Sequence, residues 1–123
     1  MCDTNKKELQ NSFHLKKIQI GKFLAKEGGS KTNSLFEKKS AIEDVESFIK
    51  LFQTNANKVC VISGLGGRTG TGATPVVLRE AKKHDKKTIA IVTMPFRFEG
   101  EKRKLQAIHG LSKISQYADL LHV

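Results

Sequence analysis

Several features that mark other classes of protein are scarce or missing in this sequence. It has no tryptophan, only two cysteines without a C-x-x-C pair, and four histidines without the spacing of metal ligands. These counts argue against a disulfide framework and against a metal site built from protein side chains alone. No apolar run approaches the roughly 20 residues of a membrane span, and the polar start is unlike a signal peptide. The absences favour a reducing, cytoplasmic setting.

Acidic side chains are also few, since 22 lysines and arginines stand against 12 aspartates and glutamates, for a net charge of +10. Such a charge by itself suggests an anionic partner, nucleic acid included. Four lysines of the more basic half surround the end of an expected helix, where lysine is favourable: Lys82, Lys83, Lys86 and Lys87. No nucleic-acid-binding motif is present. A solvated basic face is the favoured interpretation, and a basic nucleic-acid-binding domain ranks third among the functions considered.

What the chain does have is a glycine-rich stretch over residues 64–75, with five glycines in its first nine positions. An apolar run precedes it and a helix-compatible run, residues 75–84, follows it. Glycine loses much conformational entropy on folding, so a cluster indicates close approach of the backbone to something else. A strand, a glycine loop and a helix N-terminus together favour phosphate binding, because backbone N–H groups and the helix dipole attract an anion. The hydroxyls of Thr69 and Thr71 are further donors for phosphate oxygens or a magnesium-bound water.

Neither of the two commoner glycine fingerprints fits this stretch. A P-loop requires a Gly-Lys pair, which is absent here. The dinucleotide pattern G-x-G-x-x-G begins at Gly64 and Gly66 but meets Thr69 where a third glycine is needed. The stretch therefore belongs to neither of these classes.

The first half of the chain contains fewer recognisable elements. Residues 1–15 have no clear period and predict an irregular start, residues 17–20 predict a short strand, and residues 27–34 have the composition of a loop. Ser40 and Glu43 match a capping box at the start of a helix. Its expected core positions follow at helical spacing: Ile42, Val45, Phe48, Ile49 and Phe52.

The second half alternates strands and helices. The run at residues 59–63 is apolar on both faces, which is typical of a parallel strand buried between helices, and Cys60 is expected to be buried in it. Beyond the helix at residues 75–84, the expected elements are a strand at 88–93, a loop at 95–100, a helix at 101–117 and a strand at 119–123. The apolar face of the last helix is predicted at Leu105, Ile108, Leu111 and Ile114. This alternation predicts an α/β fold with a parallel sheet and flanking helices.

Residues 66–72 resemble GGGTGTG, the glycine loop of the tubulin/FtsZ family in its bacterial form, with Arg68 in place of the third glycine. The likeness continues through residues 73–77, 89–93 and 95–100, and through Arg103, in the family's order and spacing. It implies a Rossmann-like parallel sheet of the tubulin/FtsZ GTPase type, incomplete in this chain. The expected organisation is an irregular segment over residues 1–15 and a partial GTPase domain over 16–123.

The resemblance also implies a ligand, GTP with Mg²⁺, and a set of contacts to it. The phosphates are expected at the glycine loop: Gly66, Gly67, Arg68, Thr69, Gly70, Thr71 and Gly72. Glu99 is expected at the ribose and Arg103 at the sugar-phosphate side, although Glu99 has the alternative role of a helix cap. Arg68 has one of two opposite effects on phosphate binding. Its side chain obstructs the loop, which is the preferred interpretation, or its guanidinium holds phosphate. Phe96 and Phe98 are expected to pack rather than to stack on the base.

Some parts of the family pattern are not found in the chain. Residues 1–17 do not supply its first strand and first phosphate loop, and residues 28–33 only loosely resemble its γ-phosphate loop. The helix that holds guanine and the acidic loop that completes the next subunit's active site are not found either. Weak GTP binding and no catalytic residue are therefore expected. The expected partners are GTP or GDP and other FtsZ-like subunits in a filament at the division site; the alternative is a non-catalytic interaction fragment that no longer uses nucleotide.

Overall fold

The computed structural model describes residues 2–3, 10, 18–19, 49–50, 52–53 and 55–123. Two short strands, β1 (Cys2–Asp3) and β2 (Ile18–Gln19), pair in parallel. The second confirms the strand predicted at residues 17–20, whereas the first is a strand where the sequence predicts irregular chain. The capping box and the loop at residues 27–34 lie outside the described residues.

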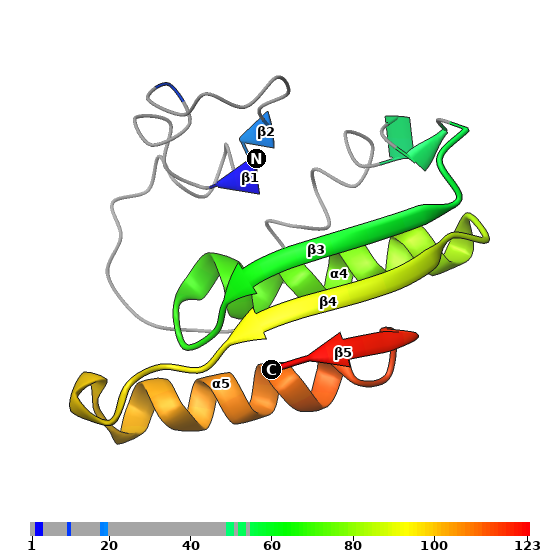
Figure 1. Cartoon of the computed structure of the whole chain (residues 1–123). Helices are drawn as coiled ribbons and strands as arrows, with labels where there is room; N and C mark the ends of the chain where they lie inside the picture. Colours follow the sequence, from blue (N-terminus) through cyan, green and yellow to red (C-terminus); the bar gives the residue numbers. More distant parts are fainter. Residues whose placement is uncertain (1, 4–9, 11–17, 20–48, 51, 54) are drawn as a thin grey trace.

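The main body of the protein is a three-stranded parallel sheet with the order β3-β4-β5 (Figure 1). Its strands are β3 (Lys58–Gly64), β4 (Lys87–Thr93) and β5 (Leu120–His122). The two connections are α4 (Arg68–Lys83) and α5 (Glu101–Ile114). Parallel neighbours need a crossover of this kind, since a tight turn cannot join them. The predicted α/β fold with a parallel sheet is confirmed.

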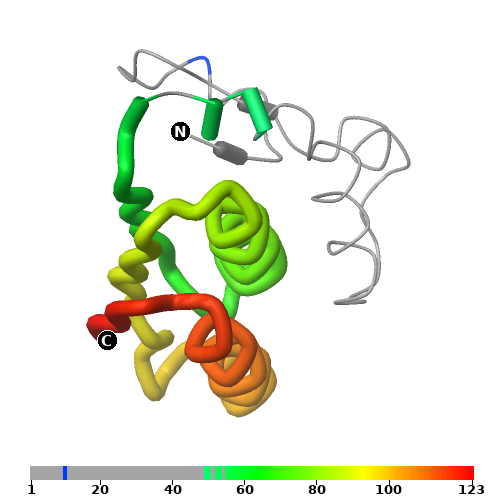
Figure 2. Tube along the Cα trace, turned by 90° about the vertical axis from the view of Figure 1, so that its right-hand side faces the viewer, coloured from blue at the N-terminus to red at the C-terminus, as the bar shows by residue number. Residues whose placement is uncertain are grey.

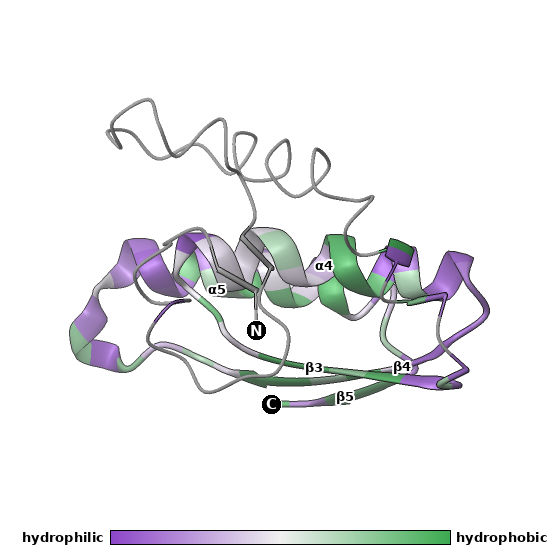
Figure 3. Cartoon of the chain, turned by 90° about the horizontal axis from the view of Figure 1, so that it is seen from above, coloured by the Kyte–Doolittle hydropathy of each residue, from purple (hydrophilic) through white to green (hydrophobic). Residues whose placement is uncertain are grey.

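Both helices pack on the same face of this sheet (Figures 2 and 3). The buried cluster between helices and strands consists of Leu65, Leu78, Ala90, Val92, Ala107 and Ile114. The other face carries a cross-strand row in which Ile62 is paired with Ile91 and Ile91 with His122. Ile62 is 75% exposed there, and Cys60 is exposed on the same strand. The prediction that this strand and Cys60 are buried between helices is therefore wrong, because both crossover helices cover one side only.

The predicted apolar face of α5 is correct only in part: Ile114 is fully buried and Leu111 packs against the core. Leu105 is 65% exposed and Ile108 is exposed as well, whereas Ala107 and Gly110 are buried. A Cβ at Gly110 would lie only 2.6 Å from Cγ2 of Thr71, so the two helices meet along small side chains. Apolar spacing alone predicts that the larger side chains face the core, whereas part of the buried face of α5 consists of small residues. The helix ends at Ile114, three residues before the predicted end.

Candidate phosphate-binding site

The glycine-rich stretch is mostly helix. Only residues 65–67 form a turn after β3, and α4 begins at Arg68 and contains Pro75 in its interior. The predicted loop up to Pro75 is therefore wrong. Glycine disfavours a helix by about 1 kcal/mol relative to alanine, but here it allows close packing: a Cβ on Gly70 would overlap the carbonyl oxygen of Gly64.

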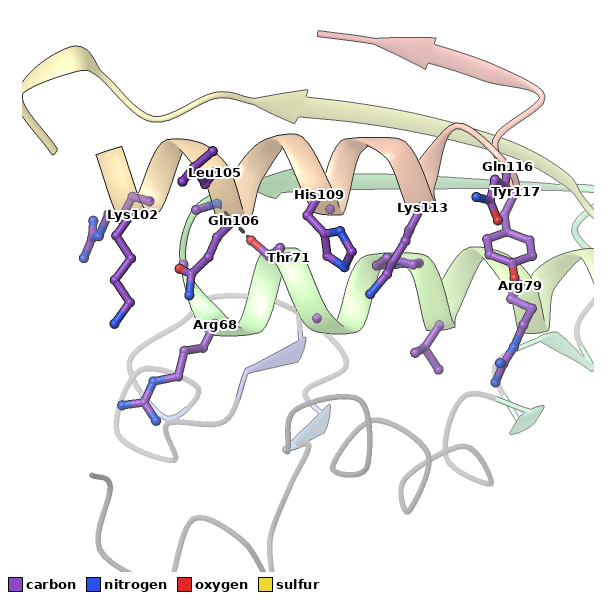
Figure 4. A pocket seen from close by; sticks show the side chains of 17 residues that line it. Arg68, Thr71, Arg79, Lys102, Leu105, Gln106, His109, Lys113, Gln116 and Tyr117 are labelled. Carbon is purple, nitrogen blue, oxygen red and sulfur yellow. Dashed lines mark hydrogen bonds between the residues drawn. The ribbon is translucent and has the colours of Figure 1, made fainter. Parts of the chain in front are cut away.

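Hydrogen bonds hold the turn between β3 and α4 in place. The N–H of Leu65 donates to the carbonyl oxygen of Thr93 at 2.9 Å, which ties the turn to the end of β4. The N–H of Gly66 donates to the hydroxyl oxygen of Thr71 at 2.8 Å, which ties it to the first turns of α4 (Figure 4). The Thr71 oxygen thus has a structural role, and its hydroxyl hydrogen is the only part that could be donated to a ligand.

Gly66 fixes the direction of the turn. Its φ of 94° lies in the region that side chains rarely adopt. A Cβ there would also lie 3.1 Å from Cγ of Pro95 and 3.2 Å from the carbonyl oxygen of Arg103. The β4–α5 connection and the start of α5 therefore lie directly against the turn, so two segments that the sequence singled out separately form one site.

The geometry presents the N-terminus of α4 at the carboxyl end of the sheet. In any helix the first N–H groups have no acceptor within the helix itself; in α4 these belong to Arg68, Thr69 and Gly70, and the N–H of Thr71 is bonded to Gly67 at 3.3 Å. The first turn contains no acidic residue, and Gly67 makes no side-chain cap. The positive end of the helix dipole therefore meets no carboxylate from its own turn, which suits an anion.

Arg68 occupies the first helical position. Among the described residues, Asp85 is the one non-glycine residue with positive φ, so the backbone of Arg68 has no conformation that a side chain disfavours. The prediction that a side chain at this position blocks the required backbone conformation is therefore wrong. The side chain of Arg68 is exposed and extends away from Thr71 (Figure 4). It places a guanidinium at the positive end of α4.

Glu99 and Arg103 contact each other. Glu99 ends the 3-10 turn η1 (Arg97–Glu99), and its carboxylate accepts the N–H of Phe96 at 2.9 Å and the Arg103 guanidinium at 2.6 Å. The Phe96 N–H, followed by the Arg103 guanidinium, lowers the pKa of Glu99. The carboxylate therefore closes the turn before α5, whereas the N-terminus of α5 at Gly100 has no side-chain cap. The side chains of Glu99 and Arg103 are 25% and 56% exposed.

The neighbouring Phe96 and Phe98 pack on one another rather than in the core. Their ring centroids lie 5.3 Å apart with nearly parallel planes. Both rings are largely exposed, at 69% and 85%. The two rings therefore pack, as expected, but on each other and not in the core.

Six of the predicted site residues border one groove of about 820 Å³ between α4 and α5: Gly66, Gly67, Arg68, Thr71, Gly72 and Arg103. Thr69, Gly70 and Glu99 are not among its lining residues. Several polar residues that were not predicted from the sequence line the same groove: Arg79, Lys102, Gln106, His109, Lys113 and Tyr117. The spacing of the four from α5, which recur at intervals of three and four, is the signal that marks them as one helix face.

The described residues provide neither a membrane-spanning helix nor a cluster of metal ligands. Neither α4 nor any other helix in that part of the chain has the length and apolarity needed to cross a bilayer. The same residues contain no cluster of histidine, cysteine, aspartate and glutamate side chains able to hold a metal ion.

The parallel sheet, its crossover helices and the glycine turn before α4 define an α/β domain in which a helix N-terminus without acidic residues lies at the carboxyl ends of the strands. The chain belongs to the Tubulin/FtsZ family, whose GTPase-domain model matches residues 1–123.

Individual relatives agree with this assignment. The chain is 41% identical over 104 residues to the cell division protein FtsZ of Buchnera aphidicola subsp. Baizongia pistaciae, covering 85% of this chain and 27% of that protein. It is 34% identical over 125 residues to the mitochondrial division protein fszB of Dictyostelium discoideum, covering 100% and 34%. An empty FtsZ dimer structure from M. jannaschii matches with a TM-score of 0.89 and 37% identity, over 98% of this chain and 35% of that one. The chain therefore spans about a third of the length of these relatives.

Proposed function

We propose that this chain is the GTP-binding part of an FtsZ-like, polymerising cell-division GTPase, and that it binds GTP or GDP by the phosphates. The observation that carries the proposal is the turn at residues 65–67, which presents the start of α4 without a carboxylate in its first turn. Membership of the family supports the choice of nucleotide. Magnesium enters with the nucleotide phosphates.

The phosphates would lie at the N–H groups of the first turn of α4. The helix dipole contributes about 0.3–1 kcal/mol for an anion at such an end. Each hydrogen bond to a charged group adds about 1.5–3 kcal/mol. The Arg68 guanidinium, at the same end of the helix, adds a positive charge next to this position. Phosphate is therefore the part of the nucleotide that this chain holds best.

The sugar would lie toward α5. The carbonyl oxygen of Arg103 borders the site of Gly66, so the start of α5 is close to the phosphate position. In this arrangement Glu99 accepts hydrogen bonds from ribose hydroxyls, while its ion pair keeps the Arg103 guanidinium near the sugar-phosphate side. No guanine contact is assigned, and we therefore expect weak binding.

Other FtsZ-like subunits, including copies of this chain, are the proposed macromolecular partners, in filaments of a dividing cell. The relatives named as cell division proteins support this assignment. The alternative function is a non-catalytic interaction fragment that retains the fold and does not use nucleotide. Nucleotide binding by the isolated chain separates the two, because only the first requires it.

The test is a titration of the chain with fluorescent N-methylanthraniloyl-GDP in the presence of magnesium, followed by competition with GDP, GTP and ADP. We expect GDP and GTP to displace the label. The Arg68→Gln variant removes the charge and leaves a shorter polar side chain, and it should weaken binding about tenfold, which corresponds to about 1.4 kcal/mol. Lys58→Gln, at the opposite end of β3, is the matched control and should bind as the unmodified chain does.

The Arg68→Gly variant decides between the two readings of this side chain. Weaker binding means that the guanidinium holds phosphate, and tighter binding means that it obstructs the site. If unlabelled GDP and GTP fail to displace the label at millimolar concentration, the proposed function is wrong and the interaction-fragment alternative is supported.

A further inference from the structure

The groove between α4 and α5 is lined by five cationic side chains. We call it the interhelix groove; its cationic lining residues are Arg68, Arg79, Lys102, Arg103 and Lys113. No aspartate or glutamate lines it within the described part of the chain. It runs along the side of the two helices that is turned away from the sheet (Figure 4). A groove with one sign of charge concentrates ligands of the opposite charge.

The charges form two parallel rows. Arg68 and Arg79 are eleven residues apart on α4, and Lys102 and Lys113 are eleven residues apart on α5. Eleven residues make about three helical turns, so the two cations of each row lie on the same face of their helix, about 16 Å apart. The groove thus presents a cationic pair at either end.

Part of this charge is not neutralised within the described residues. Arg79 pairs with Glu80 at 3.2 Å, and Arg103 pairs with Glu99. Lys102 and Lys113 take part in none of the ion pairs found in the described part of the chain. Their ammonium groups are therefore available to a ligand. Lys113 and Arg79 also lie about three turns away from the phosphate position at the start of α4, which makes this end of the groove a separate site.

The other lining residues are mostly small or apolar. Gly72, Pro75 and Val76 come from α4, and Leu105 and Gly110 come from α5. This composition suits a ligand that brings apolar groups as well as negative charge. Single-stranded nucleic acid is usually held on a series of aromatic side chains, whereas the described lining residues offer one phenol ring, Tyr117, and one imidazole, His109.

We propose that the interhelix groove is a docking site for an extended acidic peptide segment of a partner protein. An extended chain advances about 3.3 Å per residue, so five or six residues span the distance between the two cationic pairs. Alternating acidic and apolar side chains would place carboxylates at the basic rows and apolar groups between the helices. The lysines of this site lie outside the set assigned to GTP, whereas Arg68 and Arg103, which also line the groove, are shared with the nucleotide site.

Fluorescence anisotropy tests the proposal with a fluorescein-labelled hexapeptide of alternating glutamate and leucine. A second peptide with glutamine in place of glutamate is the ligand control. We expect the acidic peptide to bind, with an affinity that falls as salt rises, and the glutamine peptide to bind at least tenfold more weakly. The double variant Lys102→Gln/Lys113→Gln should lower the affinity for the acidic peptide about tenfold or more.

The matched control is Lys87→Gln/Lys104→Gln, which removes the same net charge from residues that do not line the groove. It should change the affinity less than twofold, and an equal loss in both double variants would overturn the proposal as non-specific attraction. Tighter binding of a labelled 15-nucleotide oligo-dT that depends on Lys102 and Lys113 would assign the groove to nucleic acid instead. Complete displacement of the peptide by saturating GDP would overturn the assignment of a separate site at the Arg79 and Lys113 end of the groove, whereas failure of GDP to bind leaves the peptide result intact.

Discussion

Gly70 in the first turn of α4 lies against the carbonyl oxygen of Gly64 at the end of β3, with no space for a Cβ between them. The helix therefore crosses the end of its own preceding strand at backbone contact. Thr74 donates a hydrogen bond to the hydroxyl oxygen of Ser63 at 2.9 Å, so the contact between α4 and β3 continues one helical turn further. This close approach positions the start of α4, and with it the candidate phosphate site.

We expect Gly70→Ala to destabilise the protein although alanine favours helix formation. Overpacking of this kind costs about 1–3 kcal/mol, and the gain in helix propensity returns about 1 kcal/mol. Denaturant unfolding should show the net loss. Gly67→Ala is the control, because no atom lies within 4 Å of its added Cβ and its φ of −85° suits alanine. An equal effect of the two variants would contradict the steric explanation.

The same contact explains why the sequence predicts the sheet better than the helix start. The apolar runs that became β3 and β4 are recognisable one by one, and their alternation with helices fixes a parallel sheet. The start of α4 was missed because glycines and Pro75 indicate a loop when only local propensity is considered. Packing on Gly64 reverses that preference, and a sequence alone does not show which residues meet there.

The candidate site was predicted only in part for a related reason. The glycines of the turn stand out in the sequence, and so does the spacing of Glu99 and Arg103, which form an ion pair. The basic residues of the interhelix groove depend on which face α5 turns toward α4. That rotation is set by the contact of Gly110 with Thr71, between residues far apart in the chain.

The stability of the folded protein at acidic pH depends on Asp119. Its carboxylate accepts the N–H of Thr88 at 2.9 Å and pairs with Lys82 at 2.9 Å, and these two partners lower its pKa from 3.8 to about 2. Because the folded pKa lies below the unfolded one, the stabilisation is complete above about pH 4. It is lost as the pH falls toward 2.

Asp119→Asn should therefore flatten the loss of thermal stability between about pH 4 and pH 2. The measurement is the unfolding midpoint at several pH values in that window. Asp85→Asn is the control, since Asp85 has a φ of 56°, which asparagine also accepts, and makes no ion pair among the described residues. The assignment to Asp119 would be wrong if both variants followed the unmodified protein.

The open face of the sheet should make the isolated chain prone to association. Ile62, Ile91 and Leu120 expose apolar side chains on this face, and exposed apolar patches favour self-association. Ile62→Thr should reduce light scattering on concentration, and it should change the free energy of unfolding by no more than about 0.5 kcal/mol, as exposed substitutions do. Val92→Thr, at a position 1% exposed, should destabilise the fold. Unchanged scattering in the Ile62 variant would exclude this face as the cause.

The last prediction concerns catalysis: the chain alone should show no GTP turnover. Hydrolysis needs a group that activates or orients the attacking water, most often a carboxylate or a histidine. In the described part of the chain, no aspartate or glutamate lies in the first turn of α4 or lines the adjoining groove. His109 lines the groove, but it lies six residues, about 9 Å, further along α5 than Arg103, whose carbonyl oxygen borders the turn. Glu99, the carboxylate that the sequence places at the ribose, is engaged by the Phe96 N–H and by Arg103, which keep it a weak base.

Phosphate release from GTP with magnesium, measured over a range of chain concentrations, tests this expectation. A concentration series is needed because a site that is incomplete in one copy is completed only when a second copy binds beside it. The Thr69→Ala variant separates true turnover from contamination, since Thr69 lies in the first turn of α4, where the phosphates are proposed to bind. Turnover that persists through repeated purification and disappears in Thr69→Ala would show that the described residues suffice for catalysis, and the prediction would be wrong.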